Sequence, residues 1–358
     1  MTADAWGRAQ RVLAVRLDGI GDLLMTAPAM AALKAAVPGR VITPLVSRAG
    51  AAITSLLPDC GDPILYEAPW MKHAPLMATS DQAVLERVRA ARFDAAVIFT
   101  VFSQSALPAA LFCHLAGIPL RAAHCRENPY QLLTTWIRDT EPESGIRHEV
   151  QRQLDLVAAL GAAADGAHPP LRLSAAARDW ARRVRLPGRP FVLIHPGASA
   201  PSRRYPPESF ARVLRALERE HRAFCVLTGI AEERGVMASV REQAASDAPL
   251  LWNLDPERLA ALVECADVVV TNNTGPAHLA AALQTPVVVL YALTNPQHTP
   301  WRARARVLSA DVPCRSCYRS ICPSGHHRCL RDIDPRTVVA AVDELLRDAG
   351  DSVSRALC

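Results

Sequence analysis

The feature that most constrains the fold is the stretch Ala266–Leu290, where two apolar runs lie on either side of a turn and a helix-like segment. The β-branched run Val268–Val270 predicts a buried strand, and Pro286–Leu290 predicts a second one. Between them, Ala277–Leu283 is expected to be helical. A strand, a turn, a helix and a second strand in this order are typical of a parallel α/β fold.

The turn of this unit, Thr271–Pro276, has the composition of an anion-binding helix start. Thr274 or Asn273 can cap the helix, and Gly275 allows a ligand to approach the backbone closely. Unpaired N–H groups at a helix start attract phosphate, and His278 lies one turn further on. An ordinary capped helix between two buried strands explains this stretch equally well when it is taken alone.

A second glycine-rich turn, Asp18–Asp22, follows the first expected strand. Gly19 and Gly21 would let a phosphate or an acceptor approach the start of the next helix. The spacing is not Gly-x-Gly-x-x-Gly, so it gives little support to a dinucleotide site. Asp22 could complement the helix dipole, which is the commoner role, or it could act as a base in a cleft.

Strands and helices alternate along the chain, which predicts two doubly wound α/β halves. A chain of 358 residues exceeds the usual single core, so two domains are expected. We expect an N-terminal domain at 1–168, a linker region at 169–189, a C-terminal domain at 190–334, and a final helix and tail at 335–358. The expected strands are Arg11–Leu17, Val41–Val46, Pro63–Tyr66, Ala95–Phe99, Leu120–Ala123, Phe191–His195 and Ala223–Leu227. The expected helices are Leu23–Val37, Arg48–Leu57, Gln82–Ala91, Ser105–Leu115, His148–Leu160, Ser209–Arg219, Leu259–Cys265 and Pro335–Leu346.

Two loops of the second half carry charged residues near the carboxyl ends of strands. The loop that follows Phe191–His195 contains Arg203 and Arg204, and the turn after the next strand contains Glu232 and Glu233. Because ligands of open α/β sheets bind outside the carboxyl ends of the strands, these residues are candidates for a cleft site.

Composition excludes several classes of protein. Half of the residues are hydrophobic and 21% are charged, as in a globular protein. The net charge of +5 permits an anionic substrate or a membrane surface, and no basic and aromatic patch indicates nucleic-acid binding. Residues 1–11 lack the apolar core of a secretory signal. Residues 95–120 lack Asp, Glu, Lys and Arg, but other polar residues interrupt them, so we expect a buried strand and helix and a cytoplasmic protein.

Four of the ten cysteines form a cluster near the C-terminus. Cys314 and Cys317 have the spacing of a metal-binding pair, whereas Cys322 and Cys329 follow at unusual distances. A structural zinc could bind here, but reduced thiols that pack a loop are the expected state in the cytosol.

Three motifs together resemble glycosyltransferase family 9, the bacterial heptosyltransferases. They are Arg16–Met30, His195–Glu208 and Thr271–His278. The helix that starts near His148 and the cluster Cys314–Cys329 also resemble members of this family. Each motif alone would be weak, but several in this order make the resemblance specific.

The resemblance implies a GT-B fold, with two Rossmann-like domains that face a central cleft. It implies an inverting transfer from a nucleotide-diphosphate donor, typically ADP-heptose, to the core oligosaccharide on lipid A or a related glycan. No cofactor or catalytic metal is implied. The C-terminal domain would bind the nucleotide sugar and the N-terminal domain the acceptor, while the final helix often packs back across the domain junction. The protein would be cytoplasmic, with peripheral contact to the inner membrane.

The resemblance also assigns roles to residues. Asp22 matches the family's base, and a glutamate of the second half would accept from ribose hydroxyls. The family commonly has Asp in place of Asn273 and Lys in place of Arg203, and Arg lacks the point-charge geometry of Lys. Two alternatives remain: another nucleotide-sugar enzyme of this architecture, such as an epimerase, and a non-catalytic nucleotide-sugar-binding protein. The residues expected at the donor site are Arg203, Arg204, Glu232, Glu233, Asn273, Thr274, Gly275 and His278.

Overall fold

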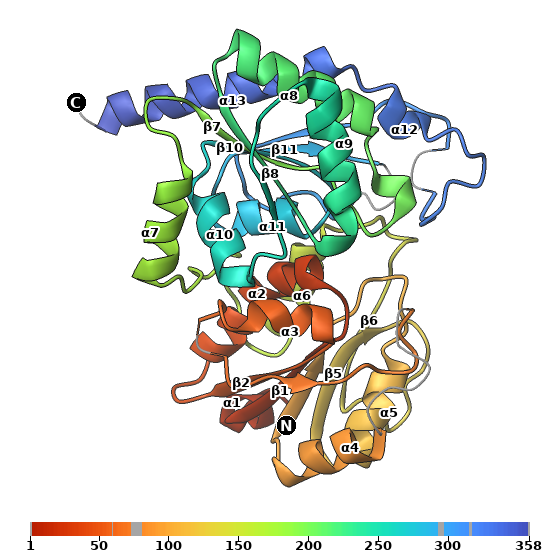
Figure 1. Cartoon of the computed structure of the whole chain (residues 1–358). Coiled ribbons are helices and arrows are strands. Elements are labelled where there is room, and N and C mark those ends of the chain that lie inside the picture. Colours follow the sequence, from red (N-terminus) through yellow and green to blue (C-terminus); the bar gives the residue numbers. More distant parts are fainter. Residues whose placement is uncertain (1, 59, 73–80, 293–296, 315–316, 357–358) are drawn as a thin grey trace. The chain divides into compact units, whose positions relative to one another are not determined.

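A computed structural model describes residues 2–58, 60–72, 81–292, 297–314 and 317–356. The chain divides into two compact units, a first unit at Met1–Arg172 and a second unit at Leu173–Cys358 (Figure 1). Each unit contains its own parallel sheet with helices on it, which confirms the expected α/β fold class.

The first unit is built on a six-stranded sheet of order β3-β2-β1-β4-β5-β6. All of its strand pairs are parallel. Its central strand β1 (Arg11–Arg16) is buried at five consecutive positions, as expected for a strand covered on both faces. The other strands are β2 (Val41–Val46), β3 (Ile64–Leu65), β4 (Ala95–Ile98), β5 (Leu120–Cys125) and β6 (Thr135–Arg138). The helices are α1 (Thr2–Arg8), α2 (Ile20–Ala35), α3 (Arg48–Thr54), α4 (Asp81–Ala90), α5 (Leu107–Leu115) and α6 (Glu149–Ala158).

The second unit repeats the topology of the first. Its sheet has the order β12-β11-β10-β7-β8-β9, which is the same order when the strands are counted from β7. The strands are β7 (Phe191–His195), β8 (Phe224–Gly229), β9 (Leu250–Trp252), β10 (Val268–Asn272), β11 (Val287–Leu290) and β12 (Ala305–Leu308). The helices are α7 (Ala175–Val184), η1 (Pro201–Arg203), α8 (Pro207–Glu220), η2 (Ala231–Glu233), α9 (Arg234–Ala244), α10 (Pro256–Cys265), α11 (Gly275–Ala282), α12 (Arg328–Arg331) and α13 (Pro335–Ala356).

This strand order creates one topological switch point in each sheet. In the first unit it lies between β1 and β4, and in the second between β7 and β10, because the connections leave these neighbouring strands in opposite directions. Ligands of doubly wound folds bind at the carboxyl side of this point. The stretch Ala266–Leu290 therefore forms one side of the second switch point, through β10, α11 and β11.

Several expected bounds were wrong. The helix expected from Leu23 begins at Ile20, so the turn after β1 is shorter than expected. The strands β6, β9 and β12 were missed, and all three lie at or next to a sheet edge, where apolar runs are short. The final helix extends beyond Leu346, and its described side chains pack on the core of the second unit.

The uncharged stretch 95–120 forms β4, α5 and the start of β5, as expected. Among the helices described, none combines the length and the apolar character that a membrane crossing requires.

Candidate functional site

The turn after β1 fixes Asp22 by two contacts. Its Oδ2 accepts a hydrogen bond from the Gly19 backbone N–H at 3.1 Å, and its Oδ1 accepts one from Arg16 Nη2 at 3.2 Å. The carboxylate remains 26% exposed. Asp22 thus complements the start of α2, which is one of its two expected roles, and its side chain stays partly exposed at the carboxyl edge of the sheet.

Arg16 is the centre of a cluster that sequence reasoning missed. Its guanidinium is 1% exposed and pairs with Asp18 at 3.0 Å, Asp22 at 3.2 Å and Glu149 at 2.7 Å. Burial alone would lower the pKa of Arg16, but the field of these carboxylates outweighs it and raises the pKa, so the cation is permanent. One cation faces three carboxylates, and burial raises the pKa of Asp18.

Helix α6 positions the Glu149 carboxylate of this cluster. The His148 imidazole accepts from Val150 N at 3.2 Å and caps the helix, which places Glu149 in its first turn. Gln153 Nε2 donates to Glu149 Oε1 at 2.6 Å and to Thr100 O at 3.1 Å. The helix therefore fixes the carboxylate that orients Arg16, which gives the family-like helix near His148 a physical role.

The second switch point is fixed by Asn272, at the end of β10. Its Nδ2 donates to Pro196 O at 2.8 Å and to Gly197 O at 3.1 Å, and its Oδ1 accepts from Tyr205 N at 3.0 Å. One buried amide thus ties both ends of the loop after β7 to the turn that precedes α11. This residue was not expected, although its position just before Asn273 in a buried strand could have indicated it.

Glu233 lies against this loop, and Glu232 does not. The Glu233 Oε2 accepts from Ile230 N at 3.0 Å and lies 3.5 Å from His195 Nε2. A Cβ built on Gly197 would lie 1.9 Å from Glu233 Cδ, so any other residue at this position would force the Glu233 side chain to move. Burial raises the pKa of Glu233 and lowers that of His195 to about 4, so His195 is neutral at pH 7. Glu232 is exposed to solvent.

The two arginines of the loop after β7 occupy different environments. Arg204 is exposed, and its Nε donates to Ala198 O at 2.8 Å. Burial raises the pKa of Glu233, and the positive charge of Arg204 partly offsets this rise. Arg203 ends η1 and is half-buried. Burial raises the pKa of the Tyr291 hydroxyl, and the Arg203 guanidinium partly offsets this, which places Arg203 beside the end of β11.

Helix α11 starts at Gly275 without the side-chain cap that was expected. Thr274 occupies the N-cap position, but its hydroxyl donates to Asn272 O at 3.4 Å and accepts no hydrogen bond from the first helical N–H groups. Asn273 is 1% exposed and its backbone N–H donates to Leu290 O at 3.2 Å. His278 is 5% exposed, so its side chain is buried.

The four clustered cysteines line one small cavity of about 90 Å³, together with Ser202, His326 and His327. Cys314 Sγ lies 3.7 Å from His326 Nε2. Within the described ranges, no group of three or more His, Cys, Asp or Glu side chains stands in a geometry that could hold a metal ion. The backbone of the cluster meets η1, since Ser202 N donates to Ser320 O at 3.1 Å.

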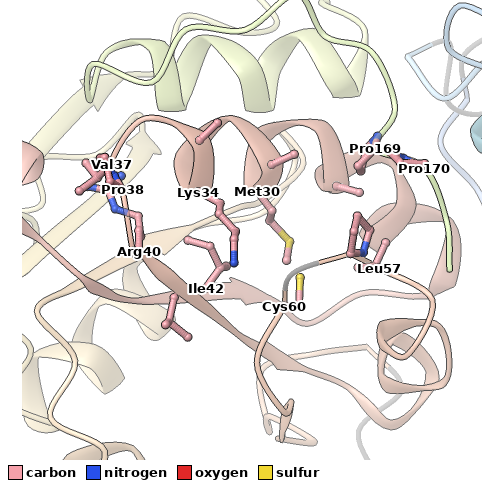
Figure 2. Close-up of a pocket in the computed structure, with 16 residues that line it drawn as sticks. Met30, Lys34, Val37, Pro38, Arg40, Ile42, Leu57, Cys60, Pro169 and Pro170 are labelled. Carbon is pink, nitrogen blue, oxygen red and sulfur yellow. The ribbon is translucent and has the colours of Figure 1, made fainter.

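A cavity of about 630 Å³ in the first unit lies apart from the residues discussed above. Figure 2 shows Met30 and Lys34 pointing from α2 into it, toward Ile42 and Cys60. The Arg40 guanidinium on its wall donates to the backbone carbonyls of neighbouring segments and so is structural. The cavity contains none of the candidate site residues, so its size does not make it the active site.

These observations define a class of protein: two Rossmann-type α/β units, each with a glycine-containing turn and fixed polar groups at its switch point. Residues 82–327 match the model of glycosyltransferase family 9 (heptosyltransferase). The chain belongs to glycosyltransferase family 9, a family of transferases, which confirms the resemblance.

Individual relatives agree with this family. Lipopolysaccharide heptosyltransferase 2 of Salmonella typhimurium is 25% identical over 95% of this chain and 99% of its own length. Lipooligosaccharide heptosyltransferase 2 of Campylobacter jejuni is 27% identical over 45% of this chain, and the match spans 53%, about half, of that relative. Two solved structures share the fold. One is a family 9 glycosyl transferase from Veillonella parvula, with a TM-score of 0.75 and 19% identity over 95% of this chain and 97% of that chain. The other is ADP-heptose lps heptosyltransferase II of E. coli, with a TM-score of 0.72 and 23% identity over 95% of this chain and 99% of that chain.

Proposed function

We propose that this chain transfers a heptose from ADP-heptose to a sugar of the lipopolysaccharide core, with inversion at the transferred carbon. The observation that carries the proposal is the second switch point, where Asn272 ties the loop after β7 to a helix start without a side-chain cap. Such a helix start favours a diphosphate, because its N–H groups and dipole both attract negative charge.

The proposed donor site uses the groups that surround this turn. The backbone N–H groups of Thr274 and Gly275 and the Arg203 guanidinium stabilise the leaving diphosphate, and the fixed carboxylate of Glu233 accepts from the ribose hydroxyls. Glu233 is chosen over Glu232 because it lies against Gly197 in the loop, whereas Glu232 is exposed. Arg204 adds positive charge beside Glu233.

The proposed acceptor side is the switch point of the first unit, with Asp22 as the general base. An inverting transfer needs a base to take the proton of the attacking hydroxyl. Gly19 and Gly21 carry no side chains, which favours close approach of an acceptor to this turn. The acceptor belongs to a lipid-linked glycan, so the same proposal places the protein in the cytoplasm, in peripheral contact with the inner membrane.

A donor and acceptor screen tests this function. ADP should raise the melting temperature, because a ligand that binds the folded state stabilises it, while UDP and GDP should not. ADP release from ADP-heptose should require a heptose-deficient core acceptor, and NMR of the product should show the opposite anomeric configuration. No ADP release with any core acceptor would leave only a binding protein. Interconversion of the sugar without an acceptor would indicate an epimerase.

A further inference from the structure

A separate cavity of about 430 Å³ lies in the first unit, at the switch point between β1 and β4. The carboxyl ends of these strands line it, at Val15, Leu17 and Asp18 and at Ile98–Thr100. Both the position and the size are those of a small-molecule site in an open α/β sheet.

One wall of this cavity is an aromatic ring in a fixed orientation. The half-buried Trp70 lines the cavity, and its ring centroid lies 5.4 Å from Tyr66 in an edge contact and 6.5 Å from Phe112. Tyr66 and Phe112 are themselves buried and stack at 4.8 Å. Because two packed rings support it, the indole presents a flat apolar surface at little entropic cost.

Another part of the lining is polar. Asp18 Oδ1 accepts from Gln104 Nε2 at 2.7 Å, and Ser103 and Ser105 stand on either side of Gln104 in the lining. Gln104 retains hydrogen-bonding capacity beyond this bond, since a primary amide offers two donors and an acceptor. Thr100, also in the lining, is 9% exposed, and its Oγ1 has no hydrogen-bond partner within the described residues.

An apolar indole and fixed hydrogen-bonding groups in one cavity match the chemistry of a sugar ring, which has a C–H face and a rim of hydroxyls. We propose that this cavity binds one sugar ring of the acceptor, with its C–H face on Trp70 and its hydroxyls on Gln104 and Asp18. This inference rests on the proposed transferase function and names the residues that would select the acceptor.

The cavity is connected to the proposed base by a single side chain. Arg16 pairs with Asp18 in the cavity wall at 3.0 Å and with Asp22 at 3.2 Å. A sugar that binds Asp18 therefore contacts the same charge cluster that holds Asp22. Acceptor recognition at Asp18 and proton removal at Asp22 would therefore be close together in the chain, at the turn after β1.

Steady-state kinetics of three variants test the inference. Trp70→Ala and Gln104→Ala should each raise the KM for the acceptor about tenfold, while the KM for the donor stays unchanged. Trp70→Phe should recover most of the loss. Trp136→Ala is the matched control, because this indole lies on β6, is 42% exposed and is absent from the cavity lining. Melting temperatures establish that each variant is folded.

The outcomes separate this inference from the proposed function. An acceptor KM within about twofold of wild type in folded Trp70→Ala and Gln104→Ala would overturn the inference, as would a rise in the donor KM alone. If Trp70→Ala does not fold, the acceptor KM of Gln104→Ala decides. If the wild type transfers no sugar, the proposed function fails, and saturation-transfer NMR with core oligosaccharide decides for the cavity. Loss of the saturation-transfer signal in Gln104→Ala would support binding of the sugar in this cavity, and an unchanged signal would refute it.

Discussion

Replacing Asp22 by Asn separates the two roles that its geometry allows. The carboxylate accepts from Gly19 N at 3.1 Å and from Arg16 Nη2 at 3.2 Å. Asn keeps one carbonyl oxygen and can preserve one of these contacts, but it loses the charge that complements the helix dipole. The expected loss in the free energy of unfolding is about 1 kcal/mol, because relief of repulsion with Asp18 offsets part of the dipole and charge-assisted terms.

The expected effect on turnover is much larger. Loss of a general base lowers kcat about 10²- to 10⁴-fold, which corresponds to about 3 to 5 kcal/mol in the transition state. The assay is ADP release under saturating donor and acceptor, together with the melting temperature and ADP affinity of each variant. Asp255→Asn is the matched control, since Asp255 Oδ1 caps α10 through Arg258 N at 2.8 Å. Near-normal kcat in Asp22→Asn, with a stability loss like that of the control, would refute the base assignment.

Three further outcomes are expected. Gly197→Ala should weaken ADP binding more than tenfold, because the added Cβ displaces the Glu233 carboxylate. Gly235→Ala should bind ADP normally in the same titration, because nothing lies within 4 Å of its added Cβ. Cys322 should react with iodoacetamide before Cys113 in timed peptide mapping, because backbone N–H groups lower the pKa of Cys322 and burial raises that of Cys113 to about 12; equal rates would contradict this. As the pH falls from about 6.5 to 4, His195 should lower the free energy of unfolding by about 1.4 kcal/mol per pH unit, because burial lowers its folded pKa to about 4 and the unfolded chain binds the proton first. Denaturant titrations at several pH values should show a smaller dependence on pH in His195→Gln.

The sequence predicted the parts of the fold that have local causes. The strand Phe191–His195 was placed with its observed bounds, because four apolar residues follow a proline. The edge strands β6, β9 and β12 were missed because they have only three or four residues and their apolar runs are short.

The candidate site was predictable only in part, for a similar reason. The glycine turn around Asp22 is a local pattern, and it was found. Glu149 is separated from Arg16 by 133 positions in the chain, so no spacing rule could join them. The helix cap expected from Thr274 does not form, because its hydroxyl donates to the Asn272 carbonyl. A threonine hydroxyl can bond to either of these local backbone partners, and the sequence does not determine which.

The buried guanidinium of Arg16 makes the charges around it interdependent. If one carboxylate is neutralised, the interaction of Arg16 with the other two becomes stronger. The stability changes of single substitutions at Asp18, Asp22 and Glu149 should therefore not sum to that of the triple substitution. If Arg16 itself is replaced by Met, the uncompensated acids must take up protons or the unit loses about 3 to 5 kcal/mol. An alanine scan of this turn would therefore measure how the cluster redistributes its protons, and only double-mutant cycles would assign a free energy to each pair.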